Sequence, residues 1–475
     1  MQLPEGSQNW ADLARLGRYF LDLVEDPSWV QRRVTVIDFV DLQRARRSVS
    51  MTISGPELLR RARKHQISIA NGIFIPLELM PKGLLVDFSI RDGNGAAIPL
   101  VTSSRDSVAA QALILACAEK SGIDPMEFSS TAIDKVYNIA HSFPTDDIVQ
   151  AVSSGINNDS LKKLWGIQTG QSSSALQVET WDRAFGDPKF RQFMATFTLQ
   201  FMPIVFVTSG SLDTDFILKT SITDSEPVLG QRSIKERLAI DGVLIQYTAT
   251  NSGLAQREHI RLNAPEGTFA TEPIVTQGLS GTEEASGTLR PSNSIHQMTT
   301  RSAATLYLNS ESSDVYNLYL ELRPTTRSFL IPSFISVASA MLILTLGVIL
   351  HASDGRLNNI ATATSGSTVA LLLIIPSLVS AYFAQPGEHE VRASLLAVPR
   401  FVVGMSAFFT TMATVPIFVN MSGRVIALTW LTASIVCVLT LIYLIVVRHN
   451  INKAIREVDL ISGLTVESQT FELED

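Results

Sequence analysis

The most distinctive pattern of the chain is a set of four long apolar runs near its C-terminus, separated by polar loops. The runs cover residues 329–350, 367–384, 395–419 and 425–447. A helix rises about 1.5 Å per residue, so about 20 apolar residues cross a bilayer core of about 30 Å. None of the runs contains Asp, Glu or Lys. The pattern therefore predicts four transmembrane helices over residues 328–447.

The preceding part of the chain has shorter apolar stretches whose spacing changes along the sequence. Residues 1–32 contain an amphipathic helix, with Trp10, Leu13, Leu16, Phe20 and Leu23 at helical spacing. Its polar face mixes acidic and basic side chains, which favours packing on the protein over lying on a membrane surface. Residues 33–190 mix strand-like and helical segments and predict a mixed α/β domain.

Residues 191–327 contain several short alternating strands, which predict a β-rich, sandwich-like domain. Residues 448–475 form a short tail whose acidic end is expected to be disordered. The expected fold is an α+β soluble region, with a mixed α/β part followed by a β-sandwich-like part. A C-terminal four-helix transmembrane bundle completes it.

One uncharged segment, residues 192–212, is long enough for a fifth span. Thr196, Thr198, Gln200 and Pro203 argue against that interpretation, and the β-branched and aromatic cluster at 204–207 is typical of a buried strand. We therefore expect a helix followed by a core strand. A fifth span would put the 33–190 region on the other side of the membrane.

Charge and signal content limit the function classes. The formal net charge of -7 argues against a dedicated nucleic-acid binder, and no nucleic-acid partner is expected. Cys437 lies inside the fourth apolar run, so a disulfide with Cys117 is not expected. Residues 1–27 lack a basic segment followed by an apolar core, so they do not form a secretory signal.

The loops between the runs predict the orientation. Seven basic residues flank the runs on one side and two on the other. By the positive-inside rule, the seven lie in the cytoplasm. We therefore expect a multi-pass protein of the cell (inner) membrane with cytoplasmic N- and C-termini. The seven are Arg323, Arg327, Arg392, Arg400, Arg448, Lys453 and Arg456, and the two are Arg356 and Arg424.

The early part of the chain has a basic region over residues 32–64, which allows three interpretations. The favoured one is a solvated sheet edge, where basic side chains discourage pairing with other chains. The others are attraction to anionic lipid headgroups and contact with a nucleic-acid backbone. The basic residues are Arg32, Arg33, Arg44, Arg46, Arg47, Arg60, Arg61, Arg63 and Lys64.

Motifs that carry chemistry are scarce. The phosphate-binding loop, the dinucleotide fingerprint, HExxH, paired CxxC and the GxSxG elbow are all absent from the sequence. Ser160 and Lys163 match the short SxxK pattern, which arises by chance. His259 and His296 could meet in the β-rich region, but no third ligand is recognisable. We assign no catalytic, cofactor-binding or metal-binding residue, and an enzyme is the less favoured class.

Two further features concern the apolar runs. Glu388-His389-Glu390 could bind a metal or act as a pH-sensitive hinge, although a polar turn is the simpler interpretation. Small side chains within the runs favour close helix packing or a homo-oligomer, with a narrow pore as the alternative. They are Ser336, Ser339, Ser377, Ser380, Ala381, Ser406, Ala407, Thr410, Thr411 and Thr414.

Three short stretches carry a resemblance to known sequences: residues 75–88, residues 263–267 and residues 384–389. Through them the chain resembles a group of uncharacterised bacterial multi-pass membrane proteins with a large soluble N-terminal region and a C-terminal helical bundle. The resemblance implies this architecture only, and no functional residue follows from it.

The sequence thus leaves three functional hypotheses. The first is a non-enzymatic membrane protein whose cytosolic region binds or senses a protein partner and is anchored in the lipid bilayer by a four-helix bundle. The second is an effector or channel whose oligomerised helices form a pore gated by the soluble region. The third is a membrane-bound enzyme with an unrecognised site.

Overall fold

Helix α1 (Trp10–Glu25) opens the part of the chain described by the computed structural model and lies against α3 (Ser103–Lys120). Its side chains Leu13, Leu16 and Phe20 are buried. The two helices approach closely because Gly17 faces α3, where a Cβ atom would lie 2.2 Å from the Ala112 carbonyl oxygen. α1 therefore packs on the protein through the face that its apolar spacing defines.

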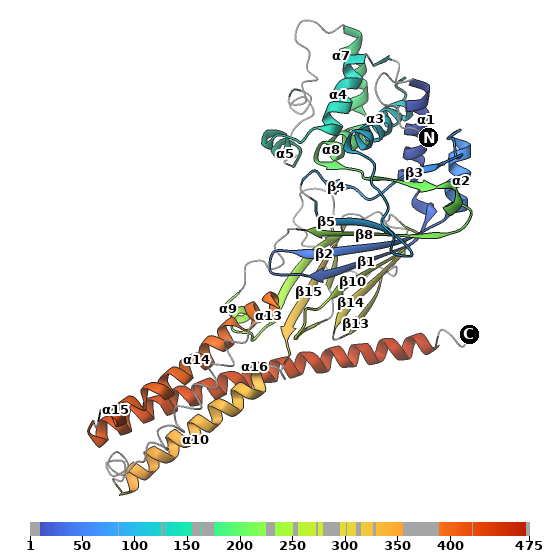
Figure 1. Cartoon of the computed structure of the whole chain (residues 1–475). Helices are drawn as coiled ribbons and strands as arrows, with labels where there is room; N and C mark the ends of the chain where they lie inside the picture. Colours follow the sequence, from blue (N-terminus) through green and yellow to red (C-terminus); the bar gives the residue numbers. More distant parts are fainter. Residues whose placement is uncertain are drawn as a thin grey trace.

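The other N-terminal helices lie in the same part of the molecule as α1 and α3 (Figure 1). They are α2 (Gly55–Lys64), α4 (Ser130–His141), α5 (Asp146–Ser153), α7 (Ala175–Gly186) and α8 (Pro188–Leu199). The structure describes residues 10–83, 85–124, 127–128, 130–153, 163, 175–224, 233–249, 255–271, 274–278, 295–300, 302–309, 315–325, 329–354, 389–419 and 421–471.

The uncharged segment 192–212 forms α8, the short strand β6 (Gln200–Phe201) and the strand β7 (Ile204–Thr208). β7 pairs with β3 (Gly72–Pro76), and Phe197, Ile204 and Val205 are buried in the same core as α1. The prediction of a helix followed by a core strand is confirmed. The segment is therefore not a fifth span.

A seven-stranded sheet lies below the helices in Figure 1, in the order β13-β14-β10-β1-β2-β8-β5. β1 and β10 are parallel, and the other neighbours are antiparallel. The strands are β1 (Val30–Phe39), β2 (Ala45–Ile53), β5 (Val86–Asp92), β8 (Phe216–Asp224), β10 (Arg257–Asn263), β13 (Ile295–Thr300) and β14 (Ala303–Asn309). Strands from both 33–190 and 191–327 thus share one sheet.

A second, four-stranded sheet faces one end of the first. Ile37 and Leu262 of the large sheet share a core with Ile245 and Leu320 of the small one, so the two sheets pack face to face. The small sheet contains β9 (Val243–Ala249), β11 (Thr268–Ala270), β12 (Ile274–Gly278) and β15 (Val315–Pro324). The short elements η1 (Pro27–Trp29), β4 (Met80–Pro81), η3 (Ser209–Ser211) and α9 (Ile234–Arg237) complete the body.

Three apolar helices project from this body side by side: α10 (Leu330–Asp354), α14 (Ala397–Met412) and α16 (Gly423–Phe471). The segments Leu330–Ile349 and Gly423–Asp459 are long and apolar enough to cross a bilayer, and α14 is apolar but shorter. The predicted run 395–419 is divided, because the helix breaks at Ala413 and resumes as α15 (Val415–Phe418). The run 367–384 lies outside the described residues, so a four-helix bundle is not seen.

The prediction of a disordered acidic end is wrong for the described part of the tail, because α16 continues to Phe471. Its buried side chains Val447, Ile451, Ala454 and Val458 recur every three or four residues, so an apolar stripe extends past the predicted span. The helix lies against β13, the edge strand of the large sheet. Covering an exposed edge in this way prevents pairing with other chains.

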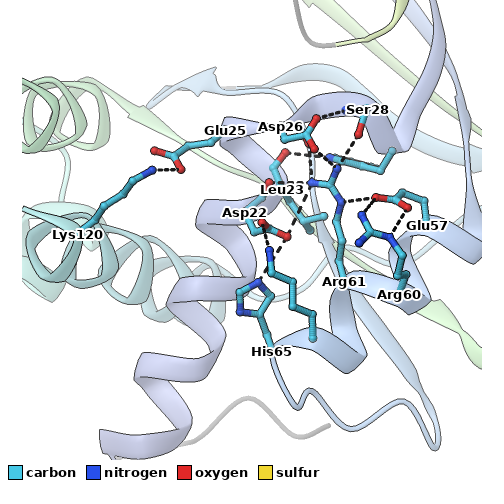
Figure 2. A network of polar contacts seen from close by, with 12 residues as sticks. Asp22, Leu23, Glu25, Asp26, Ser28, Glu57, Arg60, Arg61, His65 and Lys120 are labelled. Carbon is cyan, nitrogen blue, oxygen red and sulfur yellow. Dashed lines mark hydrogen bonds and ion pairs between the residues drawn. The ribbon is translucent and has the colours of Figure 1, made fainter.

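The favoured interpretation of the basic region 32–64 was a solvated sheet edge, and the structure shows that this does not hold for all of its residues. Arg60, Arg61, Arg63 and Lys64 lie on α2, which the sequence analysis missed. Arg61 is 1% exposed and reaches the end of α1 (Figure 2). It donates hydrogen bonds to the carbonyl oxygens of Asp22 and Asp26, at 2.8 and 2.7 Å. Its Nε donates to Glu57, so Arg61 joins α2 to the end of α1.

Candidate functional site

A buried ionic network lies between the helical core and the core of the two sheets. Arg33 of β1 and Arg47 of β2 both donate to the carboxylate of Glu78, one to each oxygen. Arg33 also lies 3.5 Å from Glu258 of β10. The side chains of Arg33, Glu78 and Glu258 are at most 6% exposed. The network thus combines two guanidinium groups with three carboxylates, those of the buried Glu78 and Glu258 and of the partly exposed Asp224 beside Arg47.

The electrostatics of the network follow from this geometry. Burial acts to lower the pKa of Arg47, but Glu78 and Asp224 outweigh it and hold that pKa above its ordinary value. Burial raises the pKa of the nearby Tyr247 on β9 to about 12. The guanidinium and phenol therefore keep their protons at neutral pH. The network is therefore a fixed layer of charged groups.

An apolar cavity of about 110 Å³ adjoins the network. Arg33 and Glu78 form its polar wall, and the rest of the lining is aliphatic, aromatic or sulfur-containing. An apolar cavity of about 150 Å³ accommodates a benzene-sized molecule, so this one suits a small apolar group. Its apolar lining includes Leu23, Trp29, Leu77, Leu113, Phe197 and Met202.

The cavity is chemically suited to binding. Its lining contains no Ser, Cys, His or Lys that could act as nucleophile or base, and its one carboxylate is bound by two guanidinium groups. Among the described residues, no group of three or more His, Cys, Asp and Glu is arranged to hold a metal ion. The arrangement can select an apolar group by shape, with the ion pair as its polar contact.

The projecting helices form the largest apolar surface of the described structure. On α16, Leu428, Ile435, Leu439 and Ile442 are each more than half exposed, and Leu342 on α10 is similar. Contiguous apolar surface of this extent on a soluble monomer would favour aggregation. Among the described residues, no charged side chain interrupts α16 between Arg424 and Arg448. The surface is chemically matched to lipid chains.

Small polar side chains of these helices lie at helix contacts. Thr410 of α14 is buried and donates to the Ser406 carbonyl oxygen at 2.8 Å. Thr345 of α10 and Ser434 of α16 share a hydrogen bond of 3.0 Å between their hydroxyl groups. Such bonds satisfy polar groups inside a helix bundle. These side chains therefore act in packing in the described chain.

The apolar helices are joined firmly to the body. Short helix α13 (Glu390–Leu395) buries Val391 and Leu395 in the core of the two sheets, directly before α14 begins. Tyr443 of α16 donates a hydrogen bond to the Leu238 carbonyl oxygen at 2.6 Å. Phe269 of β11 is buried in the core of the helices. Side chains of the sheets thus pack in the core of the helices, and side chains of α13 pack in the core of the sheets.

The structure separates most of the residues that the sequence singled out. His259 and His296 occupy strands on opposite sides of β14, each in register with Tyr307, so about two strand spacings, or about 10 Å, separate their backbones. They do not form a pair. Ser160 of the SxxK match lies outside the described residues.

His389 has a structural place at the junction. Its Nδ1 accepts a hydrogen bond from the Val391 amide at 3.3 Å and so caps α13. Its Nε2 lies 2.6 Å from the Phe39 carbonyl oxygen. The two contacts fit the neutral tautomer with the proton on Nε2. His389 therefore ties the start of the last helices to β1, and Glu388 lies outside the described residues.

The site residues that sequence reasoning missed are Glu78 and the inward-facing Arg33 and Arg47. Alternation along β1 places Arg33 on the same side as Ile37, a core position. That alternation was the available signal, because an arginine in phase with core residues must find a buried partner. No protein-family model matches the chain, and no curated protein matches it at a significant level.

Proposed function

We propose that the chain is a non-enzymatic membrane protein whose soluble body is held at the cytoplasmic face of the cell (inner) membrane and binds a partner there. The observation that carries the proposal is the lipid-compatible surface of α10 and α16 together with their firm junction to the body. Such a junction keeps the body at a fixed position close to the bilayer. A loose tether would not need the shared cores.

The path of the chain supports four crossings. α10 ends at Asp354, at the end of the projecting helices away from the body (Figure 1). The next described residue, His389, contacts β1 of the body. Between these two points the chain must return along about 37 Å, the length of α10. As a helix, the predicted run 367–384 would cover about 27 Å of that return, and the chain on either side of it is long enough for the rest.

The distribution of charge supports the orientation. Arg392, Arg400 and Arg448 lie where the helices meet the body, whereas Arg424 begins α16 at the far end. Basic residues prefer the cytoplasmic side of the membrane. This distribution supports a cytoplasmic location for the body and for the C-terminal half of α16. The apolar cavity and its ion pair could bind a small apolar group of a partner, and its lining contains no Ser, Cys, His or Lys.

Membrane extraction and topology reporters test the proposal. The full chain should remain in the membrane pellet after alkaline carbonate washing. A reporter after Asp475 should be cytoplasmic, and one inserted after Asp354 should be external. Ile435→Lys, on the exposed face of α16, should impair insertion because a charge at a span centre costs about 2.5–3.5 kcal/mol. The control Glu457→Lys lies beyond the apolar stretch and should insert normally. Carbonate extraction of the wild type, or an external C-terminus, would refute the proposal.

A further inference from the structure

The outward face of the large sheet is strongly basic although the chain as a whole is acidic. Inward positions of β1 and β10, such as Ile37 and Leu262, belong to the core, so the alternate positions face away from it. Those positions carry exposed cations and, on β1, β2, β8 and β10, a single carboxylate, that of Asp38. The cations are Arg32, Arg46, Lys219, Arg257 and Arg261, with Arg91 on β5. We call these six residues the basic face.

Two pairs of like charges lie directly opposite each other on the basic face. Arg32 of β1 is in register with Arg257 of β10, and Arg91 of β5 is in register with Lys219 of β8. Like charges at such positions repel each other and destabilise a sheet. No carboxylate of the described chain forms an ion pair with any of these four residues. The fold therefore maintains two repulsive pairs on an open surface.

The surroundings of the Arg32–Arg257 pair also favour the binding of an anion. The Nη2 atom of Arg32 lies 3.4 Å from Nδ1 of His259, which is two positions after Arg257 in the chain. Burial, together with Arg32 and Arg257, lowers the pKa of His259. The imidazole is thus a neutral acceptor beside two guanidinium groups. An anion placed there would be stabilised by both cations.

We propose that the basic face binds an acidic, extended segment of a partner protein, with carboxylates over the Arg32–Arg257 and Arg91–Lys219 pairs. This inference rests on the proposed role of the body as a partner-binding unit. The two pairs are separated by three strand spacings and offset by two residues, which gives about 16 Å. An extended chain covers that distance in about five residues. Two acidic pairs five positions apart therefore fit.

The position of the pairs argues against the bilayer in which the chain is anchored. The strand nearest α16 is β13, whereas β5, which carries Arg91, is the opposite edge of the sheet (Figure 1). On β14, the strand next to β13, the outward positions Thr305 and Tyr307 are uncharged. Headgroup binding would place the cations near α16. They lie in the middle of the sheet and at the far edge.

The composition of the face favours a protein over a nucleic acid. Val34 shares a row of the sheet with Lys219 and is only half-buried, and Ile217 shares a row with Arg32 and is exposed, so apolar side chains of a partner can cover them. Arginine is enriched at protein interfaces and lysine is depleted, and five of the six cations here are arginines. The net charge of -7 repels a long polyanion, whereas a short acidic segment is influenced mainly by charges within about 8 Å.

Fluorescence anisotropy with the full chain in zwitterionic detergent micelles tests the inference. The probe is a labelled peptide of about ten residues with two Glu–Glu pairs five positions apart. It should bind, and raising the salt concentration should weaken binding. A peptide with Gln in place of each Glu should bind at least tenfold more weakly. The double variant Arg32→Gln/Arg257→Gln should also raise the Kd at least tenfold.

The matched control is Arg63→Gln/Arg237→Gln, which removes the same charge from exposed helix positions elsewhere. It should change the Kd less than twofold. Equal effects of the two double variants, or absence of peptide binding by the wild type, would overturn the inference. So would tighter binding of single-stranded oligouridylate that the Arg32/Arg257 variant abolishes. Removing a repulsive pair should leave the melting temperature unchanged or higher, which separates lost binding from misfolding. Carbonate extraction of the same variants reports separately on the membrane proposal.

Discussion

The guanidinium group of Arg61 lies 2.6 Å from the carboxylate of Asp26, although 35 residues separate them in the chain. The side chain of Arg61 is only 1% exposed, and its nitrogens donate to Asp22, Asp26, Ser28 and Glu57 (Figure 2). Five N–H donors are available to an arginine, and the geometry uses them all. The contact fixes the end of α1, which lines the cavity.

Arg61→Met is expected to lower the free energy of unfolding by about 1–3 kcal/mol, because it leaves the Asp22 and Asp26 carbonyl oxygens and the partly exposed carboxylates of Asp26 and Glu57 without their donor. Urea unfolding of the full chain in detergent, followed by tryptophan fluorescence, measures the change. Arg63→Met, on the exposed side of the same helix, should stay within about 0.5 kcal/mol of the wild type. Similar losses in both variants would contradict the role assigned to Arg61.

The buried carboxyl group of Asp106 should make the stability of the fold fall as the pH rises. Burial raises its pKa to about 8, and its Oδ1 accepts a hydrogen bond from the Ile204 amide. Between about pH 4 and 8 the folded state holds a proton that the unfolded state has lost, so the stabilisation present below pH 4 falls as pH rises through this window. Asp106→Asn should flatten that part of the stability profile and stabilise the protein at pH 7 by on the order of 3 kcal/mol.

The comparison for Asp106 is Asp213→Asn at an exposed position, which should leave the profile unchanged. Thermal unfolding at several pH values from 4 to 9 measures both variants. A wild-type stability that rises between pH 5 and pH 8, with no difference in Asp106→Asn, would show that Asp106 is already ionised in the fold.

Glu78 is the centre of the buried network. Glu78→Gln leaves Arg33 and Arg47 without their shared counter-charge and should cost about 3–5 kcal/mol. Because Glu78 also forms the wall of the cavity, the variant should alter the fluorescence of Trp29, which lines it. Glu457→Gln removes an exposed, helical ion pair and should cost less than about 0.5 kcal/mol. A neutral effect of Glu78→Gln would mean that the two guanidinium groups reach solvent.

Local patterns predicted much of the body. Helical spacing identified the face of α1 that carries Leu13 and Phe20, and alternation identified most strands of both sheets. Pairing partners were not accessible in this way. β1 pairs with β10 more than two hundred positions away, and nothing in either strand encodes that register.

The candidate site was not predicted from the sequence for the same reason. Arg33, Arg47 and Arg61 were grouped with exposed arginines because composition alone does not distinguish a buried cation from a solvated one. Their partners, Glu78 and Asp26, come from other elements. The cavity arises where α1, α8 and β1 meet, which is a property of tertiary packing.

Gly347 and Gly404 offer a matched test of helix packing. A Cβ atom at Gly347 of α10 would lie 1.8 Å from the Trp430 ring of α16, whereas one at Gly404 of α14 meets nothing within 4 Å. Gly347→Ala should lower the melting temperature, because α10 and α16 must separate. Gly404→Ala should raise it slightly, since alanine is favoured over glycine in helices by about 1 kcal/mol. A stabilising effect at both positions would refute the close approach of the two helices.

The channel and anchor hypotheses make opposite predictions about ion currents across a planar bilayer. The buried polar side chains Thr410 and Ser434 form hydrogen bonds to a neighbouring carbonyl group or, in the Thr345–Ser434 pair, to another hydroxyl group, and so act in helix packing. We therefore expect the purified full chain to give no single-channel currents in planar bilayers at 100 mV. Thr410→Val, which removes the hydroxyl at nearly constant volume, should leave that baseline unchanged. Reproducible currents that Thr410→Val alters would favour a pore, and membrane anchoring would then serve conduction. Carbonate-resistant protein without currents supports the anchor.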